Sequence, residues 1–282
     1  MQASAICLFL YSGRVDDRFQ FGKNWKDFNR IASIENRESA CNSLLKLLLK
    51  EEIAGKSVLD IGSGSGIHSF SFLRLGATHV TAIDYDVESV AATNEMLLEF
   101  NSSTYRVQRA DILDLSSMPT EKFDIVYSWG VLHHTGNLQR AITNASGFVK
   151  PGGLFVVALY RKTPYCWFWK VEKRFYSKAS LRTQQRIMNV YRKIFSTALM
   201  LTRGQRLRQY ELVYKSRRGM NLSHDFHDWL GGYPYESISA RQYQATIGKD
   251  FSLIRKFTKS PIPDVLGSGC DEFVHRKSLT SQ

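Results

Sequence analysis

Apolar and polar positions change their spacing several times along this chain, and each change predicts a different element. Short apolar runs at residues 58–61, 80–83, 123–129 and 154–158 have the length and composition of buried strands. Between them, apolar residues recur every three or four positions, which is the period of a helix that packs by one face. Strands that alternate with helices in this way form a parallel sheet with right-handed crossovers. The pattern over residues 56–160 therefore predicts an α/β core.

The segments on either side of this core add helices and two further strands. Residues 1–55 end in a leucine-rich helical stretch, and we expect an N-terminal helical segment there. Residues 237–282 begin with a helical pattern and continue with short apolar runs at 251–257 and 272–276. We expect this part to complete the core with its last two strands.

Between these parts lies an insertion with a different pattern, residues 161–236. Apolar residues recur at helical spacing over 181–201, with basic and polar residues on the opposite side. A second helix is expected at 205–215, and residues 220–235 are expected to be rich in turns because glycine and proline end them. Insertions after parallel strands cover the crevice where ligands bind, so we expect a helical cap.

The first apolar run ends in three alternating glycines, Gly62, Gly64 and Gly66. Glycines let the backbone turn sharply and let a ligand lie directly against it. A dinucleotide fingerprint needs a glycine at the sixth position from Gly62, where Ile67 stands, so NAD and NADP are not expected. The carboxylate of Asp60 would repel a pyrophosphate and attract the cationic amino-acid end of S-adenosylmethionine.

Acidic residues after the next two strands complete a predicted cofactor site. Asp84 ends the second apolar run, 20 residues after Gly64, where an acid can accept both ribose hydroxyls. Asp111 follows the third strand and is placed to receive an adenine amino group. The full set of predicted cofactor-binding residues is Asp60, Gly62, Ser63, Gly64, Asp84, Tyr85, Asp111, Ile112, Ser128 and Trp129.

At these residues the chain resembles the class I S-adenosylmethionine-dependent methyltransferases, and within them the branch that includes the ubiquinone and menaquinone biosynthesis methyltransferases. The ordered motifs that carry the resemblance are the glycine turn, the two acids, the fourth strand and Pro151-Gly152-Gly153 before the fifth. The resemblance covers residues 56–160 strongly and 237–282 weakly. It implies a Rossmann-like seven-stranded methyltransferase sheet with helices on both faces, an antiparallel last strand, and a helical basic insertion after strand five.

Two histidines follow the fourth strand, His133 and His134. Transfer of a methyl group to a hydroxyl requires removal of its proton, and a histidine with a pKa near neutrality is a competent base. The resemblance to the quinone-biosynthesis enzymes places substrate-facing residues at this position. We expect one of the two to be the catalytic base, with His134 preferred; the alternative is that one histidine packs against the following helix.

The inserted segment has its own cluster of polar residues, and three of them, His224, Asp225 and His227, are predicted to bind the substrate as part of a lid. Two alternatives remain open. The segment could be a polar turn held by its own hydrogen bonds, or these three side chains could form a metal site. The reaction that we expect requires no metal.

The positive charge of the chain is concentrated in one stretch. The net charge is +12, and residues 161–218 hold sixteen lysines or arginines against only Glu172 and Glu211. Aromatic residues at 167–169 beside Lys170 are typical of a helix at a membrane interface. An anionic membrane surface or a lipid-linked substrate is therefore favoured as the partner of the cap. Nucleic acid is a less favoured partner, and a merely solvated charged face is the remaining alternative.

The remaining features concern location and reaction. Four scattered cysteines without a close pair indicate reduced thiols, and the short apolar run at residues 6–11 lacks the features of a signal or a membrane span. We expect a cytoplasmic protein, peripheral to the membrane if the cap binds lipid. The expected reaction is O-methylation of a small or lipid-linked acceptor, such as a quinol or a sugar hydroxyl. An RNA methyltransferase that uses the basic cap and a non-catalytic S-adenosylmethionine-binding scaffold are the alternatives.

Overall fold

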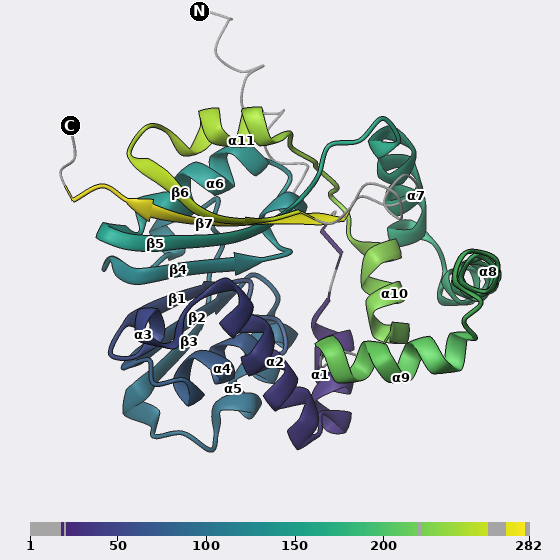
Figure 1. Cartoon of the computed structure of the whole chain (residues 1–282), viewed down its shortest axis with the longest axis horizontal. Coiled ribbons are helices and arrows are strands. Elements are labelled where there is room, and N and C mark those ends of the chain that lie inside the picture. Colours follow the sequence, from purple (N-terminus) through teal and green to yellow (C-terminus); the bar gives the residue numbers. More distant parts are fainter. Residues whose placement is uncertain (1–17, 20, 219–221, 259–268, 280–282) are drawn as a thin grey trace, which may run out of the picture.

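A single mixed sheet organises the chain in the computed structural model, which describes residues 18–279 except 20, 219–221 and 259–268. The strand order is β3-β2-β1-β4-β5-β7-β6 (Figure 1). The strands are β1 (Ser57–Ile61), β2 (His79–Asp84), β3 (Tyr105–Arg109), β4 (Phe123–Trp129), β5 (Val149–Tyr160), β6 (Phe251–Phe257) and β7 (Cys270–Lys277). Strands β1 to β5 run parallel, whereas β7 lies antiparallel between β5 and β6. The predicted seven-stranded sheet with an antiparallel last strand is confirmed.

Helices cover both faces of this sheet, as the alternating pattern predicted. They are α1 (Gly22–Ile31), α2 (Ile34–Leu47), α3 (Lys50–Ile53), α4 (Ile67–Arg74), α5 (Val87–Leu97), α6 (Leu138–Gly147) and α11 (Ala240–Ile247), with short 3₁₀ turns η2 (Ser102–Thr104), η3 (Leu115–Ser117) and η4 (Leu132–His134). Successive strand residues point to opposite faces, so Val58 packs with Phe28 and Leu44 while Leu59 packs with Ala141 and Tyr243. Each face of the sheet therefore has its own apolar core.

The fifth strand is longer than its sequence predicts. Pro151-Gly152-Gly153 stands before the strand expected at 154–158, but β5 already begins at Val149. The pairing of β5 with β4 shifts register between Phe123 and Ile125, and Gly152 takes a positive φ of 75°. The irregularity is thus accommodated inside the strand, because glycine at this point allows the local bend.

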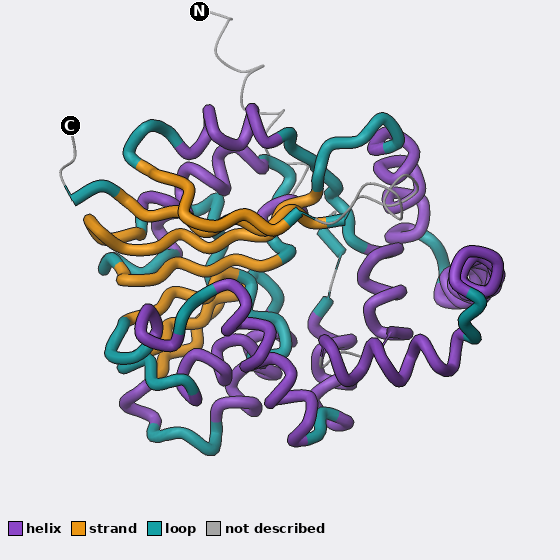
Figure 2. Tube along the Cα trace, in the orientation of Figure 1, coloured by secondary structure: helices purple, strands orange, loops and turns teal. Residues whose placement is uncertain are grey.

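Four helices between β5 and α11 stand apart from the sheet, beyond the carboxyl ends of β1 to β5 (Figures 1 and 2). They are α7 (Cys166–Lys178), α8 (Leu181–Arg203), α9 (Leu207–Arg218) and α10 (Leu222–Gly231), and we call them the cap. The predicted helices at 181–201 and 205–215 correspond to α8 and α9. No helix within the described ranges is long and apolar enough to cross a membrane.

The prediction of a turn-rich stretch at 220–235 was wrong for most of that stretch, because it contains the helix α10. Leu222, Phe226 and Leu230 recur every fourth residue and are all buried. Helix α10 packs against α7, α8 and α9 and is the centre of the cap. Glycine and proline after this helix suggested turns, but the apolar period of the residues before them decided the structure.

Candidate active site

A large cleft separates the carboxyl ends of the strands from the cap. Its volume is about 1850 Å³, and its lining residues come from the glycine turn, from the loops after β2, β3 and β4, and from α2, α7, α8 and α10. The strand order reverses between β1 and β4, which is where open α/β sheets bind their ligands. Small-molecule sites usually measure about 300–1,000 Å³, so this cleft has room for a cofactor and a second molecule.

The glycine turn after β1 forms the floor of this cleft and requires its glycines. Gly62 and Gly64 have φ values of 77° and 55°, in the left-handed region that side chains with a Cβ rarely adopt. A Cβ on Gly62 would lie 2.4 Å from side-chain carbons of Val131, and one on Gly64 would lie 3.0 Å from the indole nitrogen of Trp25. The turn therefore presents bare backbone to the cleft, as a closely bound cofactor needs.

Asp84, at the end of β2, holds this turn and lines the cleft. Its Oδ2 accepts a hydrogen bond of 3.0 Å from the Gly64 amide, and its Oδ1 accepts one of 2.9 Å from the Asp86 amide. Burial raises the pKa of Asp84 to about 6. Each carboxylate oxygen has a further lone pair, so Asp84 can still accept the ribose hydroxyls that we predicted for it.

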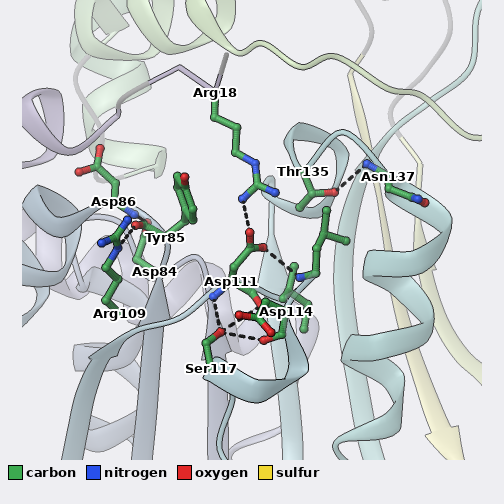
Figure 3. A network of polar contacts seen from close by, with 12 residues as sticks. Arg18, Asp84, Tyr85, Asp86, Arg109, Asp111, Asp114, Ser117, Thr135 and Asn137 are labelled. Carbon is green, nitrogen blue, oxygen red and sulfur yellow. Dashed lines mark hydrogen bonds and ion pairs between the residues drawn. The ribbon is translucent and has the colours of Figure 1, made fainter. Parts of the chain in front are cut away.

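Tyr85 and Asp111 form the neighbouring part of the site, together with a residue that the sequence analysis missed. Arg18 reaches from the N-terminal segment to Asp111, with a distance of 3.0 Å between Arg18 Nη1 and Asp111 Oδ2 (Figure 3). The guanidinium carbon of Arg18 also lies 4.5 Å from the centre of the Tyr85 ring. Ile112 is buried beside Asp111 and lines the cleft. No local pattern marked Arg18, because it lies more than 60 residues from its partners.

Two of the predicted cofactor residues lie behind the cleft wall. Asp60 is only 2% exposed, and its carboxylate accepts a hydrogen bond of 2.6 Å from the Ser69 hydroxyl of α4. Ser128 is fully buried and donates to the carbonyl of Ile61 at 3.1 Å. Within the described chain neither side chain lines the cleft. Contact of these two side chains with the cofactor stays a prediction, and their buried positions do not favour it. In the structure, both residues support the glycine turn from behind.

Ser63 and Trp129 do line the cleft. The hydroxyl of Ser63 lies 2.9 Å from that of Thr93 on α5, which ties the turn to the helix. The indole N–H of Trp129 donates to Glu272 of β7 at 2.8 Å. Both side chains are therefore held in place by neighbours on other elements.

His133 and His134 both line the cleft, in the turn η4. Nδ1 of His133 accepts the Tyr160 amide at 3.3 Å, so a neutral ring carries its proton on Nε2, which has no partner among the described residues. Nδ1 of His134 lies 2.8 Å from the carbonyl of Pro234 and donates to it, so Nε2 is unprotonated in the neutral ring. Burial lowers the pKa of His133 well below its usual range and that of His134 to about 4. Both rings are therefore neutral at pH 7, and both are weak bases.

The predicted substrate residues all fall on α10 but have different surroundings. Asp225 lines the cleft and accepts a hydrogen bond from the Tyr214 hydroxyl. Nδ1 of His227 lies 2.8 Å from the Tyr176 hydroxyl. The side chain of His224 is outside the described part of the chain. No three metal-binding side chains come together in the described ranges.

Other charged residues of the cap line the cleft although the sequence analysis did not predict them as site residues, among them Glu172, Lys173 and Asp228. Asn24 of α1 donates to Asp228 at 2.9 Å, and burial raises the pKa of Asp228 well above its usual range. A signal for Lys173 was present, because Trp169, Lys173 and Tyr176 share one face of α7 at helical spacing. In so basic a segment, one lysine on the inner face was not distinguished from the others.

Comparison with known proteins gives a consistent family. A family model described as a methyltransferase domain matches residues 53–211. Over 114 residues the chain is 37% identical to a ubiquinone biosynthesis O-methyltransferase of Xanthomonas oryzae pv. oryzae, which covers 40% of this chain and 46% of that protein. Over 140 residues it is 29% identical to a demethylmenaquinone methyltransferase of Tropheryma whipplei, covering 47% and 56%. The chain thus spans about half the length of the curated relatives that it matches.

Solved structures support the same fold at low sequence identity. Magnesium protoporphyrin IX methyltransferase from Synechocystis PCC 6803, with S-adenosylhomocysteine bound, has a TM-score of 0.52 and 14% identity over 91% of this chain and 94% of that one. An S-adenosylmethionine-dependent methyltransferase from Listeria monocytogenes, whose assignment is itself provisional, has a TM-score of 0.51 and 15% identity over 86% and 99%. These likenesses extend over most of this chain, and they concern the fold alone.

Proposed function

The chain belongs to the class I S-adenosylmethionine-dependent methyltransferase family, and from this premise we propose that it methylates a hydroxyl group of a small or lipid-linked acceptor. The observation that carries the proposal is the cleft itself. It continues from the cofactor floor, past His133 and His134, onto the apolar face of α8. A molecule with a hydroxylated polar end and an apolar remainder matches these two parts.

The residues on the sheet side suit the cofactor. When bound, S-adenosylmethionine supplies a methyl group on a positively charged sulfur, and the acceptor oxygen takes this methyl as the carbon–sulfur bond breaks and leaves its electron pair on sulfur. We assign Asp84 to the ribose hydroxyls and Tyr85 and Asp111 to the adenine. The glycine turn lets the cofactor lie against the backbone. None of these roles needs a rearrangement of the sheet.

The residues at the deep end of the cleft suit a hydroxyl acceptor. His134 is the better placed base, because its proton on Nδ1 is held by Pro234 and its Nε2 can accept another. His133 is buried and His134 is half-buried where they line the cleft beneath the cap, which limits the access of water to the transfer. Their low pKa values mean that the acceptor hydroxyl must itself be acidic or be made acidic by the site, as a quinol hydroxyl can be.

The apolar part of the cleft favours an acceptor with a lipid tail. Ile187, Val190, Ile194 and Ala198 follow one face of α8 and line the cleft. Val190 and Ile194 are 56% and 63% exposed, so this face is open to an apolar ligand. The names of the relatives in ubiquinone and menaquinone biosynthesis support the same class of acceptor.

The outer surface of the cap favours contact with an anionic membrane. Trp167 and Phe175 of α7 and Leu181 of α8 are large apolar residues that are 68%, 63% and 79% exposed. They lie within the segment that holds sixteen basic residues. Exposed apolar side chains next to cations are the combination that binds lipid headgroups, so we propose a peripheral membrane position.

A methyl-transfer assay with labelled S-adenosylmethionine tests this proposal. The acceptors are a quinol with a prenyl tail, the same quinol without the tail, a sugar and a structured RNA. We expect label in the quinols, more in the tailed one. Label in RNA alone would favour the RNA methyltransferase. Binding of S-adenosylhomocysteine without transfer to any acceptor would favour a scaffold.

A further inference from the structure

Lys173 is a buried cation in the wall of the acceptor part of the cleft. It lies on α7 and is 3% exposed, although lysine is among the residues that are least often buried. No described residue forms a hydrogen bond or a close ion pair with its ammonium group. Burying a charge without a partner is costly, so this ammonium group needs a negative partner that the described chain does not supply.

Three aromatic rings hold the position of this ammonium group. Nζ lies 5.6 Å from the ring centre of Tyr235, 5.8 Å from that of Trp169 and 6.0 Å from that of Tyr160. The faces of aromatic rings attract cations but do not neutralise them. The rings therefore keep Lys173 charged and oriented, while a hydrogen-bonding partner is still missing.

The adjacent carboxylate of Glu172 does not fill this role. Both of its oxygens are buried and have no hydrogen-bond partner among the described residues. Burial raises the pKa of Glu172 to about 7 and lowers that of Lys173 to about 8. The two charges attract each other and so counteract part of the effect of burial, but neither oxygen of Glu172 forms a hydrogen bond with the ammonium group.

A second unsatisfied donor lies in the same wall. The Nε2–H of His133 has no partner among the described residues, and the charge of Lys173 is close enough to lower the pKa of both His133 and His134. The titratable and charged groups that interact with Lys173 from the elements around it are His133, His134, Tyr160, Glu172, Tyr235 and Cys270. The indole N–H of Trp169 is a third such donor, and donors without acceptors in one wall point to a ligand that carries an acceptor.

We propose that the ammonium group of Lys173 binds an oxyanion of the methyl acceptor. The inference rests on the proposed hydroxyl methylation and adds the charge of the group that the site selects. The oxyanion is either the ionised hydroxyl that receives the methyl or a second acid group on the same molecule. In the first case the hydroxyl loses its proton to Nε2 of His134, and Lys173 lowers the pKa of the bound hydroxyl so that this weak base can remove the proton.

Two matched probes separate these sources of the oxyanion. Catechol has two hydroxyls and no other acid, and 3,4-dihydroxybenzoate adds a carboxylate. Each is assayed for kcat and KM over pH 6–10 with the wild-type chain, with Lys173→Met and with Lys173→Arg. Lys170→Met is the control, since Lys170 lies on the same helix and is exposed.

The two sources predict different results for Lys173→Met. If Lys173 holds the ionised hydroxyl, kcat/KM for catechol at pH 7 falls at least about tenfold and its pH profile moves at least about one unit higher. If it holds a second acid, KM for 3,4-dihydroxybenzoate rises at least about tenfold while catechol is unaffected. Lys173→Arg recovers part of either loss, and Lys170→Met behaves as wild type.

Stability and binding provide checks that do not depend on turnover. Methionine in place of an uncompensated buried cation should raise the melting temperature of the ligand-free protein, so a loss of activity would not reflect unfolding. Unchanged kcat, KM and pH profile in Lys173→Met for both probes would overturn the proposal. If the wild type methylates neither probe, the proposed function fails for this acceptor class. In that case, calorimetry measures the binding of 3,4-dihydroxybenzoate to the S-adenosylhomocysteine complexes of the wild type and of Lys173→Met. The role of Lys173 is overturned if the wild type does not bind this probe, or if the variant binds it with equal affinity.

Discussion

Arg18 and Asp111 form an ion pair of 3.0 Å in the part of the cleft that we assign to the adenine of the cofactor. Both side chains are partly exposed there, and Arg18 also covers the Tyr85 ring (Figure 3). The adjoining backbone is fixed to the cap, because the Phe19 amide donates to the carbonyl of Tyr233 at 2.8 Å. The N-terminal segment therefore links the predicted cofactor site to the cap, and we expect the cofactor to compete with Arg18 for Asp111.

Removal of this arginine should strengthen cofactor binding. We expect Arg18→Ala to lower the Kd of S-adenosylhomocysteine about two- to fivefold, since a partly exposed ion pair is worth about 0.2–1 kcal/mol. Calorimetry measures the effect, with Arg109→Ala as the control, because Arg109 contacts Tyr85 but not Asp111. Weaker binding by Arg18→Ala would mean that the arginine contacts the cofactor instead of competing with it.

Asp84 provides a test of the cofactor site itself. Asp84→Asn should raise the Kd of S-adenosylhomocysteine at least about tenfold, because hydrogen bonds to a charged group are worth roughly 1.5–3 kcal/mol. Since burial raises the pKa of Asp84 to about 6, the affinity of the wild type should fall as pH drops below that value. Glu121→Gln, an exposed change outside the cleft, should bind as the wild type does. Equal affinity of Asp84→Asn and wild type would remove Asp84 from the site.

Asp60 should make stability depend on pH. Burial raises its pKa from 3.8 to about 7, so the folded state binds more protons than the unfolded state between these values. The free energy of unfolding should therefore fall as pH rises from about 4 to 7. Asp60→Asn should remove this loss and stabilise the protein by a few kcal/mol at pH 8, since a tenfold change in proton affinity is worth about 1.4 kcal/mol.

Urea unfolding at pH 5 and pH 8 measures the effect of Asp60→Asn, with Glu121→Gln as the control. An asparagine at position 60 can still accept the hydrogen bond from Ser69. A variant no more stable than the wild type at pH 8 would show that the Asp60 carboxylate has a compensating partner.

The two histidines predict a particular pH profile. His134→Ala should lower turnover by roughly 10²–10⁴ while cofactor affinity is kept. Because burial lowers the pKa of His134 to about 4, the wild type should lose no activity through histidine protonation between pH 8 and pH 5. His79→Ala, outside the cleft, is the control. Full turnover in both His133→Ala and His134→Ala would show that the acceptor needs no histidine base.

The basic cap predicts salt-sensitive binding to anionic vesicles. Replacement of Arg182, Arg186, Arg192 and Lys193 by glutamate should abolish sedimentation with phosphatidylglycerol vesicles and leave cofactor binding intact. Wild-type binding should weaken sharply between 0.1 M and 1 M salt, because the Debye length falls from about 10 Å to about 3 Å. The matched control reverses Arg74, Arg106, Arg140 and Lys249, which are exposed outside the cap. Equal vesicle binding by both variants would show that the cap charges have no specific role.

The architecture followed from local patterns. The alternation of apolar runs predicted the sheet, and the period of α8 predicted the longest cap helix. The glycine turn was recognisable because Gly62 and Gly64 have positive φ values, which residues with a Cβ rarely adopt. These positions therefore need glycine. The spacing of apolar residues and the steric need for glycine both depend on only a few neighbouring residues, so the sequence shows them directly.

Contacts between distant residues were decided only by the tertiary structure. Arg18 meets Asp111 across more than 90 residues, and Lys173 acquires its aromatic surroundings from β5 and from Tyr235. Asp60 is predicted to contact the ligand, and only the packing of α4 against β1 shows that its carboxylate also bonds to Ser69. The burial of a side chain and its contacts with distant residues depend on how the elements pack. The same charged side chain can therefore be solvated, buried or facing a ligand while the residues next to it in the sequence stay the same.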